Sequence, residues 1–232
     1  MTILEKIPEH LGIIIDGNRR WAEEKGLPSF EGHRRGLDNV KRIGDWCYEK
    51  RVKIITFYAF SIENWNRTKI EVAYLMKLLE GAVSGKYLAD LNEKKIQLRV
   101  IGQKERLSKS LQYKIIKAEK STRNNKNGIL NLAVSYGGRA EIVQAIKNII
   151  KNKTAAEQIT EDLISENLWT RGLPSPDLII RTGGEQRLSN FLTWQSIYSE
   201  LYFTDKYWPD FNENDLDKAF FDFSQRERRL GK

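Results

Sequence analysis

Residues 11–21 read LGIIIDGNRRW, and the rest of the chain can be placed around this stretch. Leu11–Ile15 contains four apolar residues in five, three of them β-branched, which is typical of a short strand buried on both faces of a parallel sheet. The DGN that follows favours a turn, and two arginines and a tryptophan then stand at the expected start of a helix. In open α/β sheets ligands bind at the carboxyl ends of the strands, where a helix N-terminus also offers N–H groups to an anion. The same residues also suit an ordinary strand-to-helix turn in which Asp16 or Asn18 caps the helix.

The composition is that of a globular protein, with 40% hydrophobic and 30% charged residues among 232. A net charge of +8 favours anionic partners such as phosphates, nucleic acids or an anionic membrane face, without choosing among them. The single cysteine, Cys47, excludes a disulfide within the chain, suits a reducing compartment and falls on the apolar face of a predicted helix. The sequence has neither the ~20-residue apolar run of a membrane-spanning helix nor the apolar core of a signal peptide. We therefore expect a cytoplasmic protein.

Strand and helix patterns alternate along the chain. Strands are predicted at 11–15, 53–60, 96–101, 129–135, 177–180 and 201–203, and helices at 33–50, 70–95, 107–123, 140–151, 160–169, 190–198 and 215–229. The helix at 107–123 is strongly basic. Such alternation predicts a mostly parallel central sheet with right-handed crossovers. We therefore expect one α/β domain over residues 1–232, with about six strands flanked by helices.

Polar clusters directly follow four of the predicted strands: DGNRR, SIENWNR, YGGR and RTGGE. Because the carboxyl ends of parallel strands meet at one edge of a sheet, the side chains expected to gather there are those of Asp16, Glu63, Asn64, Arg67, Arg181 and Arg187. Several arginines with a few carboxylates suit phosphate oxygens bridged by a divalent cation. The number of arginines favours two anionic groups over a single diphosphate.

Other kinds of site lack their residues. The nearest match to a P-loop, GAVSGKY at 81–87, is one residue too short and lies inside a predicted helix. No G-x-G-x-x-G opens the first helix, no G-x-S-x-G elbow is present, and the D-D-x-x-D signature of trans-prenyl synthases is absent. A zinc site would have only Cys47, His10 and His33 to draw on.

Five ordered segments resemble the cis-prenyltransferases: HLGIIIDGNRRWA, YAFSIENWNR, NLAVSYGGRAEIV, the stretch 177–211, and RERRLG near the C-terminus. The resemblance covers nearly the whole chain. It implies an enzyme that uses Mg²⁺ to condense isopentenyl diphosphate with an allylic diphosphate primer, such as farnesyl or geranylgeranyl diphosphate. The implied product is a cis-polyprenyl diphosphate, a lipid carrier precursor for cell-wall or glycan synthesis. It also implies a hydrophobic tunnel for the growing chain, a homodimer, and peripheral membrane association through the lipid product.

The resemblance also assigns roles residue by residue. Asp16 is implied to handle Mg²⁺ and the diphosphate, Glu200 to be the second metal ligand, and Asn64 to be the proton acceptor. The implied allylic diphosphate site is Gly17, Asn18, Arg19, Arg20, Trp21, Ser29, His33 and Arg67. The implied substrate loop is Ser61, Ile62, Glu63 and Trp65. The implied isopentenyl diphosphate site is Arg181, Arg187, Leu188 and Ser189, completed by Arg229 and Gly231 of an R-x-G tail that family dimers pass to the neighbouring subunit. Because a neutral amide is a poor base, we expect Asn64 to position the proton for a diphosphate oxygen or a water.

Three positions depart from the pattern of many bacterial members. Arg19 replaces a glycine, Ile62 stands where many have a second serine, and Ser29 stands where many have a phosphate-binding arginine. Arg19 is the candidate to supply the charge that Ser29 lacks. The candidate tunnel walls are Ala59, Leu75, Leu78, Leu79, Ala82, Val83, Leu132 and Val134, although ordinary core is the favoured interpretation for any one of them taken singly.

Two other functions would also suit parts of the sequence. A non-catalytic partner subunit of a heteromeric synthase would lose the Asp16 and Asn64 motifs, which are intact here. A basic nucleic-acid-binding protein would account for the charge, but no RNP, KH or helix-turn-helix signature is present. We therefore expect diphosphate substrates and no nucleic acid.

Overall fold

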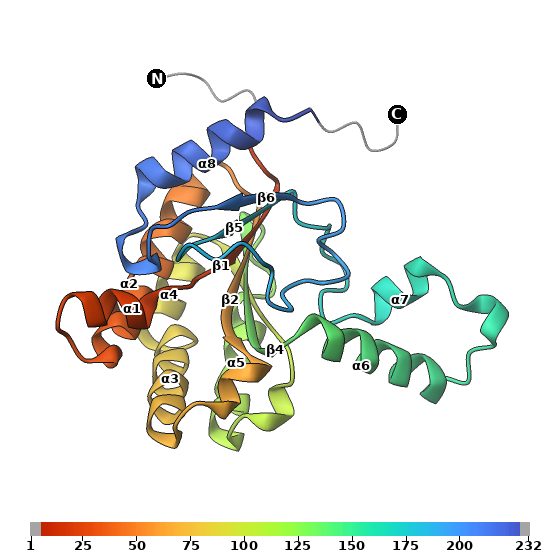
Figure 1. The fold of residues 1–232 in the computed structure, drawn as a ribbon. Coiled ribbons are helices and arrows are strands. Elements are labelled where there is room, and N and C mark those ends of the chain that lie inside the picture. Colours follow the sequence, from red (N-terminus) through yellow and green to blue (C-terminus); the bar gives the residue numbers. More distant parts are fainter. Residues whose placement is uncertain (1–5, 228–232) are drawn as a thin grey trace.

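A single parallel sheet forms the centre of the computed structural model, which describes residues 6–227 (Figure 1). Its strands are β1 (His10–Ile14), β2 (Ile54–Ser61), β3 (Ile96–Ile101), β4 (Gly128–Tyr136), β5 (Leu178–Arg181) and β6 (Glu200–Phe203). They lie in the order β3-β4-β2-β1-β5-β6, and every neighbouring pair is parallel. The predicted six-stranded α/β sheet is therefore confirmed.

Helices cover both faces of this sheet. They are α1 (Asn18–Glu24), α2 (Ser29–Glu49), α3 (Lys69–Ala82), α4 (Gly85–Glu93), α5 (Lys109–Thr122), α6 (Gly138–Lys151), α7 (Glu161–Asn167) and α8 (Glu213–Gln225), with short 3₁₀ turns η1 (Ile62–Asn66), η2 (Lys104–Arg106), η3 (Ala156–Gln158) and η4 (Trp208–Asp210). Helices α2, α3, α4, α5 and α8 contribute to one hydrophobic cluster on one side of the sheet, and α6 and α7 project from the other (Figure 1). Between Lys6 and Glu227, no helix is long and apolar enough to cross a membrane.

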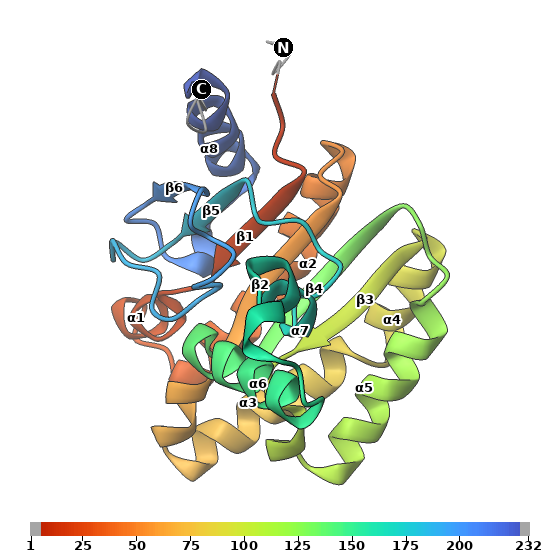
Figure 2. The same cartoon turned by 90° about the vertical axis from the view of Figure 1, so that its right-hand side faces the viewer.

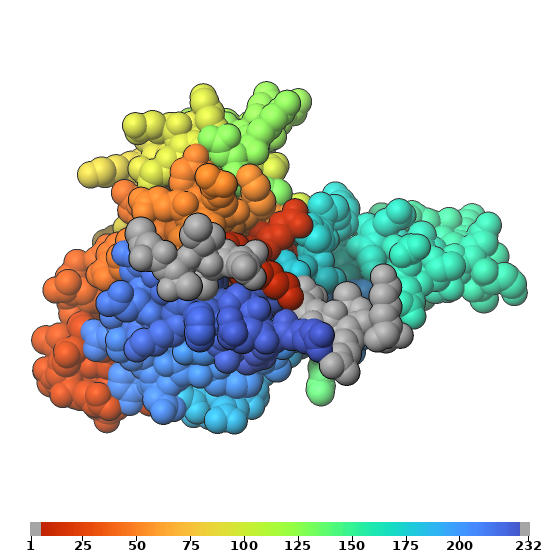
Figure 3. Space-filling view, turned by 90° about the horizontal axis from the view of Figure 1, so that it is seen from above, coloured from red at the N-terminus to blue at the C-terminus, as the bar shows by residue number. Residues whose placement is uncertain are grey.

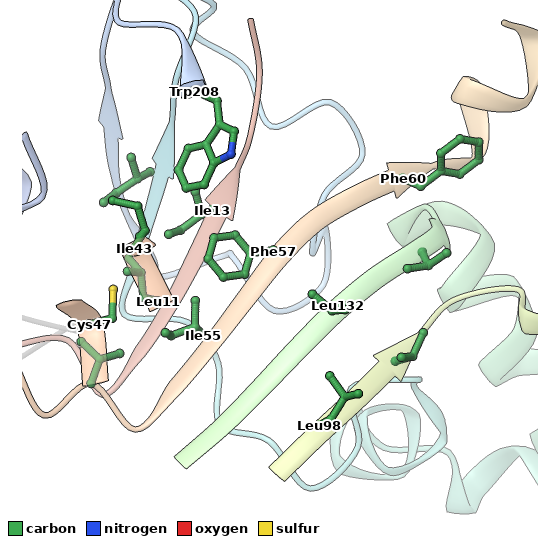
Figure 4. Packing of buried hydrophobic residues seen from close by; sticks show 14 of the residues in the cluster. Leu11, Ile13, Ile43, Cys47, Ile55, Phe57, Phe60, Leu98, Leu132 and Trp208 are labelled. Carbon is green, nitrogen blue, oxygen red and sulfur yellow. The ribbon is translucent and has the colours of Figure 1, made fainter. Parts of the chain in front are cut away.

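The core follows the alternation of the strands. Leu11, Ile13 and Phe57 point to the side of α2 and α8, where they form the larger hydrophobic cluster (Figure 4). Their neighbours Ile14 and Tyr58 belong to a smaller cluster on the opposite face. Both faces of the central strands are therefore buried, as their continuous apolar runs predict. Cys47 is also fully buried in the larger cluster, as expected.

Two helix predictions were wrong. The helix expected over 70–95 is broken into α3 and α4, because Gly85 adopts φ +57° and the Ser84 hydroxyl donates to the carbonyl of Glu80. The segment 190–198 forms turns instead of a helix, and Asn190 and Leu192 in it have φ of 66° and 45°. The last helix ends at Gln225, and the part expected beyond residue 227 lies outside the described residues.

Candidate functional site

The loop after β1 is held rigidly at the sheet edge. The Asp16 N–H donates to Thr182 Oγ1 at 3.0 Å, and the Asp16 carbonyl accepts from Thr182 Oγ1 at 2.8 Å and from the Trp208 N–H at 3.0 Å. Gly17 has φ +95°, and a Cβ there would lie 2.5 Å from Tyr207 Cδ1, so only glycine fits. No side chain caps α1, so the interpretation of Asp16 or Asn18 as a helix cap is wrong. The Asp16 carboxylate is left to face other partners.

Those partners are arginines from two other segments, which with Asp16 we call the Asp16 cluster: Asp16, Arg20, Arg181, Glu185 and Arg187. Arg181 Nη2 donates to Asp16 Oδ2 at 2.8 Å, and Arg20 Nη2 lies 3.5 Å from Asp16 Oδ1. Arg20 also lies 3.7 Å from Glu185, which pairs with Arg187. The register places Ile14 of β1 beside Arg181 of β5, so parallel pairing brings these side chains together.

Arg181 is the buried member of this cluster. Its residue is 4% exposed, and its Nη1 donates to Ser189 Oγ at 2.7 Å and to the carbonyl of Arg187. Its Nε has no hydrogen-bond partner among residues 6–227. Arg181 therefore connects the loop 187–189 to the loop after β1, and its Nε–H is a buried donor that these contacts do not use.

Two arginines and a histidine surround Glu71, and we call Arg19, His33, Arg67 and Glu71 the Glu71 cluster. Glu71 accepts from Arg67 Nη1 at 2.9 Å and from His33 Nε2 at 3.2 Å, and Arg19 lies 3.9 Å away. Burial lowers the pKa of His33 even though Glu71 opposes the shift, so the imidazole is neutral and its Nε2 carries the proton given to Glu71. Burial alone would raise the pKa of Glu71, but Arg67 and His33 lower it overall.

Glu71 and Glu185 were missed as site residues in the sequence. Glu71 follows Arg67 by four positions at the start of a helix, a spacing at which side chains meet. Glu185 stands two residues before Arg187 in the RTGGE cluster. These spacings could have identified the two glutamates, because each carboxylate lies beside arginines whose positive charges would otherwise repel one another.

The substrate loop predicted from the sequence lies in η1 and is fixed from both ends. Asn64 Oδ1 accepts from the Ser61 N–H at 3.1 Å, which leaves the Nδ2 protons of Asn64 available. Trp65 Nε1 donates to Ser135 Oγ at 2.9 Å, and Glu63 accepts from Asn190 Nδ2 at 3.0 Å. The Asn190 contact connects η1 to the segment that was wrongly predicted to be a helix.

One cavity of about 460 Å³ runs from these clusters into the protein. Its mouth is lined by Asp16, Gly17, Asn18, Arg19, Arg20, His33, Asn64 and Arg67. Its interior walls include seven of the eight candidate tunnel residues, namely Ala59, Leu75, Leu78, Leu79, Ala82, Leu132 and Val134. The exception, Val83, is 1% exposed and packs in the core instead. The volume is in the range of pockets that bind small ligands.

The remaining predicted residues are not all at the mouth. Trp21 is buried and its Nε1 has no hydrogen-bond partner within residues 6–227, and Ser29 begins α2. The residues that line the cavity do not include Trp21, Ser29, Arg181 or Arg187. Ile62 lies in η1, and Leu188 packs at the edge of the smaller core cluster. Arg229 and Gly231 lie outside the described residues.

Glu200 does not join Asp16 within one copy of the chain. It begins β6, pairs in register with Leu178 and accepts from Arg226 at 2.8 Å. Leu178 is three residues before Arg181, and at about 3.3 Å per residue this is roughly 10 Å along the strand. The role of Glu200 as a metal ligand therefore stays a prediction that this chain alone does not complete.

The side chains at the mouth suit Mg²⁺ only when a bound substrate supplies further ligands. Within residues 6–227 no group of three or more His, Cys, Asp or Glu side chains could hold a metal ion. Asp16 offers one carboxylate at the mouth, with a side chain that is 34% exposed. Mg²⁺ is commonly bound through one or two carboxylates together with substrate phosphates and waters, and Asp16 fits that mode.

Comparisons with known proteins agree with this site. The model of a family described as putative undecaprenyl diphosphate synthase matches residues 14–231. The chain is 47% identical over 230 residues to a ditrans,polycis-undecaprenyl-diphosphate synthase of Legionella pneumophila described as (2E,6E)-farnesyl-diphosphate specific, covering 97% of this chain and 96% of that protein. It is 48% identical to an isoprenyl transferase of Bacillus cereus, covering 97% and 88% of the two chains. Among solved structures, lavandulyl diphosphate synthase of Lavandula x intermedia in complex with dimethylallyl diphosphate superposes with a TM-score of 0.92 at 39% identity, covering 97% and 98%.

Proposed function

Because the chain belongs to the undecaprenyl diphosphate synthase family and is therefore a prenyl transferase, we propose that it makes a cis-polyprenyl diphosphate. Its substrates are isopentenyl diphosphate and an allylic diphosphate primer such as farnesyl or geranylgeranyl diphosphate, and the reaction depends on Mg²⁺. The product serves as a lipid carrier precursor for cell-wall or glycan synthesis. The protein works in the cytoplasm, at the membrane face that receives this lipid.

The observation that supports this proposal is a single cavity with a cationic mouth and an apolar interior. Guanidinium groups of the Asp16 and Glu71 clusters gather at the sheet edge, and aliphatic side chains line the space behind them. An isoprenoid diphosphate has the matching polarity, with a charged head and a hydrocarbon tail. Two carboxylate-centred groups of cations also suit two diphosphates better than one.

The chemistry follows from where charge develops. The allylic C–O bond breaks, C4 of isopentenyl diphosphate forms the new carbon–carbon bond, and a proton then leaves C2. Arginines fixed before the reaction stabilise the negative charge that grows on the departing diphosphate. When bound, Mg²⁺ supplies further charge stabilisation at the diphosphate, with Asp16 as its protein ligand. Asn64 donates from Nδ2 and positions the substrate, since its Oδ1 already accepts from Ser61.

We also propose that the protein is a homodimer through the outer face of α6. Val143, Ile146 and Ile150 are 49%, 45% and 68% exposed, and their spacing puts them on one face of that helix. Figure 3 shows the α6–α7 region projecting from the body of the molecule. A second copy presenting the same face would bury an apolar stripe that a monomer leaves in water.

Asp16→Asn tests the catalytic assignment. The change keeps the shape of the side chain but removes the charge that faces Arg181, so product formation from radiolabelled isopentenyl diphosphate, Mg²⁺ and farnesyl diphosphate is expected to fall by at least 10³-fold. Asp162→Asn, an exposed carboxylate on α7, is the matched control and should retain activity. A folded Asp16→Asn protein with undiminished product would refute the assigned role. An inactive wild type with every primer length would refute the proposed function itself.

A further inference from the structure

The segment 104–126, which contains η2 and α5, carries most of the protein's net charge. It holds six lysines and two arginines against two glutamates, a net +6 within a chain whose total is +8. None of the residues assigned to substrates lies in this segment. The basic helix predicted from the sequence therefore has no part in the function proposed above.

The outer face of α5 combines this charge with two large apolar side chains. Tyr113 and Ile116 are 69% and 61% exposed, and exposed Lys109 and Lys120 flank them along the same face. Spacings of four, three and four residues from 109 to 120 put these side chains in one stripe. The opposite face is fully used by the core, which buries Leu111, Ile115, Ala118 and Thr122. The stripe is therefore not needed for packing.

Three lysines on and beside this stripe have no ion pair within the described residues, although other charges of the segment are paired. Glu119 pairs with Lys104, and Lys114 pairs with Glu80 of α3. Lys109, Lys117 and Lys120 have no ion pair between Lys6 and Glu227. Exposed cations without partners, beside exposed apolar side chains, form a surface complementary to anionic headgroups over hydrocarbon.

We propose that the exposed face of α5 docks the protein on an anionic lipid membrane. Charge alone would serve a nucleic acid as well, but Tyr113 and Ile116 stand in the middle of the stripe, where they would insert below the headgroups. The interpretation deepens the proposed function and rests on it only in supposing that the product is a lipid.

The position of α5 makes this docking useful to the proposed reaction. Figure 2 shows α5 on the outside of the molecule beside β3 and α4. Its Lys114–Glu80 pair joins it to α3, the helix that supplies Leu75, Leu78, Leu79 and Ala82 to the cavity wall. At the other end of the segment, Arg106 lies 4.9 Å over the ring of Trp65 near the mouth. Docking through α5 therefore brings one wall of the cavity close to the bilayer that takes up the product.

The test is sedimentation of the full chain with vesicles of phosphatidylglycerol and phosphatidylcholine in equal parts, without substrate. Wild type should bind these vesicles but not vesicles of phosphatidylcholine alone, and binding should weaken as salt is added. Replacing Lys109, Lys117 and Lys120 with glutamine should lower the partition coefficient about 100-fold. Ile116→Ser should lower it about 10-fold. The matched control replaces three exposed lysines elsewhere, Lys151, Lys153 and Lys218, and should bind like wild type.

Three results would overturn the proposal: no binding of wild type to the mixed vesicles, full binding by the triple-glutamine variant, or full binding by Ile116→Ser. The last result would mean plain attraction to a polyanion, which duplex DNA should then compete for. Vesicle binding needs no catalysis, so a chain that binds but makes no product refutes only the proposed function. A chain that makes product but does not bind refutes only the docking surface.

Discussion

Arg181→Lys tests whether Arg181 acts as a clamp, which we define as one side chain that holds Asp16 and the loop 187–189 together, or only as a positive charge. Arg181 reaches three acceptors with two nitrogens, because its planar guanidinium spans Asp16 on one side and the loop 187–189 on the other. A lysine keeps the charge but ends in one compact ammonium group. It can retain the pair with Asp16 only by giving up the contacts with Ser189 and the Arg187 carbonyl.

The magnitude follows from these contacts. Two hydrogen bonds from a charged donor are lost, at about 1.5 kcal/mol each. The substitution also removes the buried Nε that has no partner in the described chain, which returns about 1 kcal/mol. The free energy of unfolding should therefore fall by about 2 kcal/mol. For a chain of this length that is a Tm lower by roughly 4–8 °C.

Thermal unfolding followed by circular dichroism measures this change, and initial rates with isopentenyl diphosphate measure its effect on the site. The KM for isopentenyl diphosphate should rise about 10-fold because the loop 187–189 is no longer held. Ser189→Ala, which removes one of the two bonds, should cost about 1.5 kcal/mol. Arg171→Lys, at an exposed position, should change stability by less than about 0.5 kcal/mol. An Arg181→Lys protein with wild-type Tm and KM would show that the clamp does not exist.

Two further predictions concern parts of the chain away from the mouth. Burial lowers the pKa of His10 to about 4 from 6.5, so the unfolded chain binds the proton more readily than the folded chain. The free energy of unfolding should therefore fall by up to about 3 kcal/mol as pH falls from about 6.5 towards 4. Urea midpoints of His10→Gln should depend less on pH across this range, and the same pH dependence as in wild type would contradict the assignment. Ile146→Glu with Ile150→Glu places charges on the apolar face of α6 and should convert the proposed dimer to a monomer in light scattering, whereas a dimer that persists would place the interface elsewhere.

The sequence prediction used the rule that the carboxyl ends of parallel strands meet at one edge of the sheet, and this rule held for residues at the ends of strands. Asp16 and Arg181 are 165 residues apart, yet Asp16 lies just beyond the end of β1 and Arg181 is the last residue of β5, and parallel pairing of these two strands brings them together. Continuous apolar runs likewise fixed which strands are buried on both faces. The same reasoning placed seven of eight candidate residues in the cavity wall, because they lie on strands and on one face of α3.

Loops were predicted less well because their conformation depends on side-chain contacts from elsewhere. The apolar residues of 190–198 fit a helical spacing, but Asn190 bonds to Glu63 of η1 and to the N–H of Arg139, and these contacts hold the segment in turns. Glu200 follows that segment and is the first residue of β6. Because β6 runs parallel to β5, Glu200 lies beside Leu178, at the start of β5, and not at the end of β5 where Arg181 lies. No local pattern at Glu200 distinguishes the two ends of the sheet.

The arginines of the Asp16 and Glu71 clusters divide into two kinds, and the division has a function. Arg181 is buried and bonded at 2.8 Å to Asp16, and Ser189 and the Arg187 carbonyl hold its other terminal nitrogen, so the orientation of the carboxylate does not depend on substrate. Arg19, Arg20 and Arg187 have side chains that are 60%, 41% and 62% exposed, and they pair with carboxylates that phosphate oxygens can replace. The pairs of Arg20 and Arg187 with Glu185 are exposed, and such pairs are worth at most about 1 kcal/mol. Glu71 is buried, but it keeps Arg67 and His33 as partners when Arg19 leaves it. Incoming diphosphates can therefore take the exposed guanidinium groups at little cost, while Asp16 keeps Arg181.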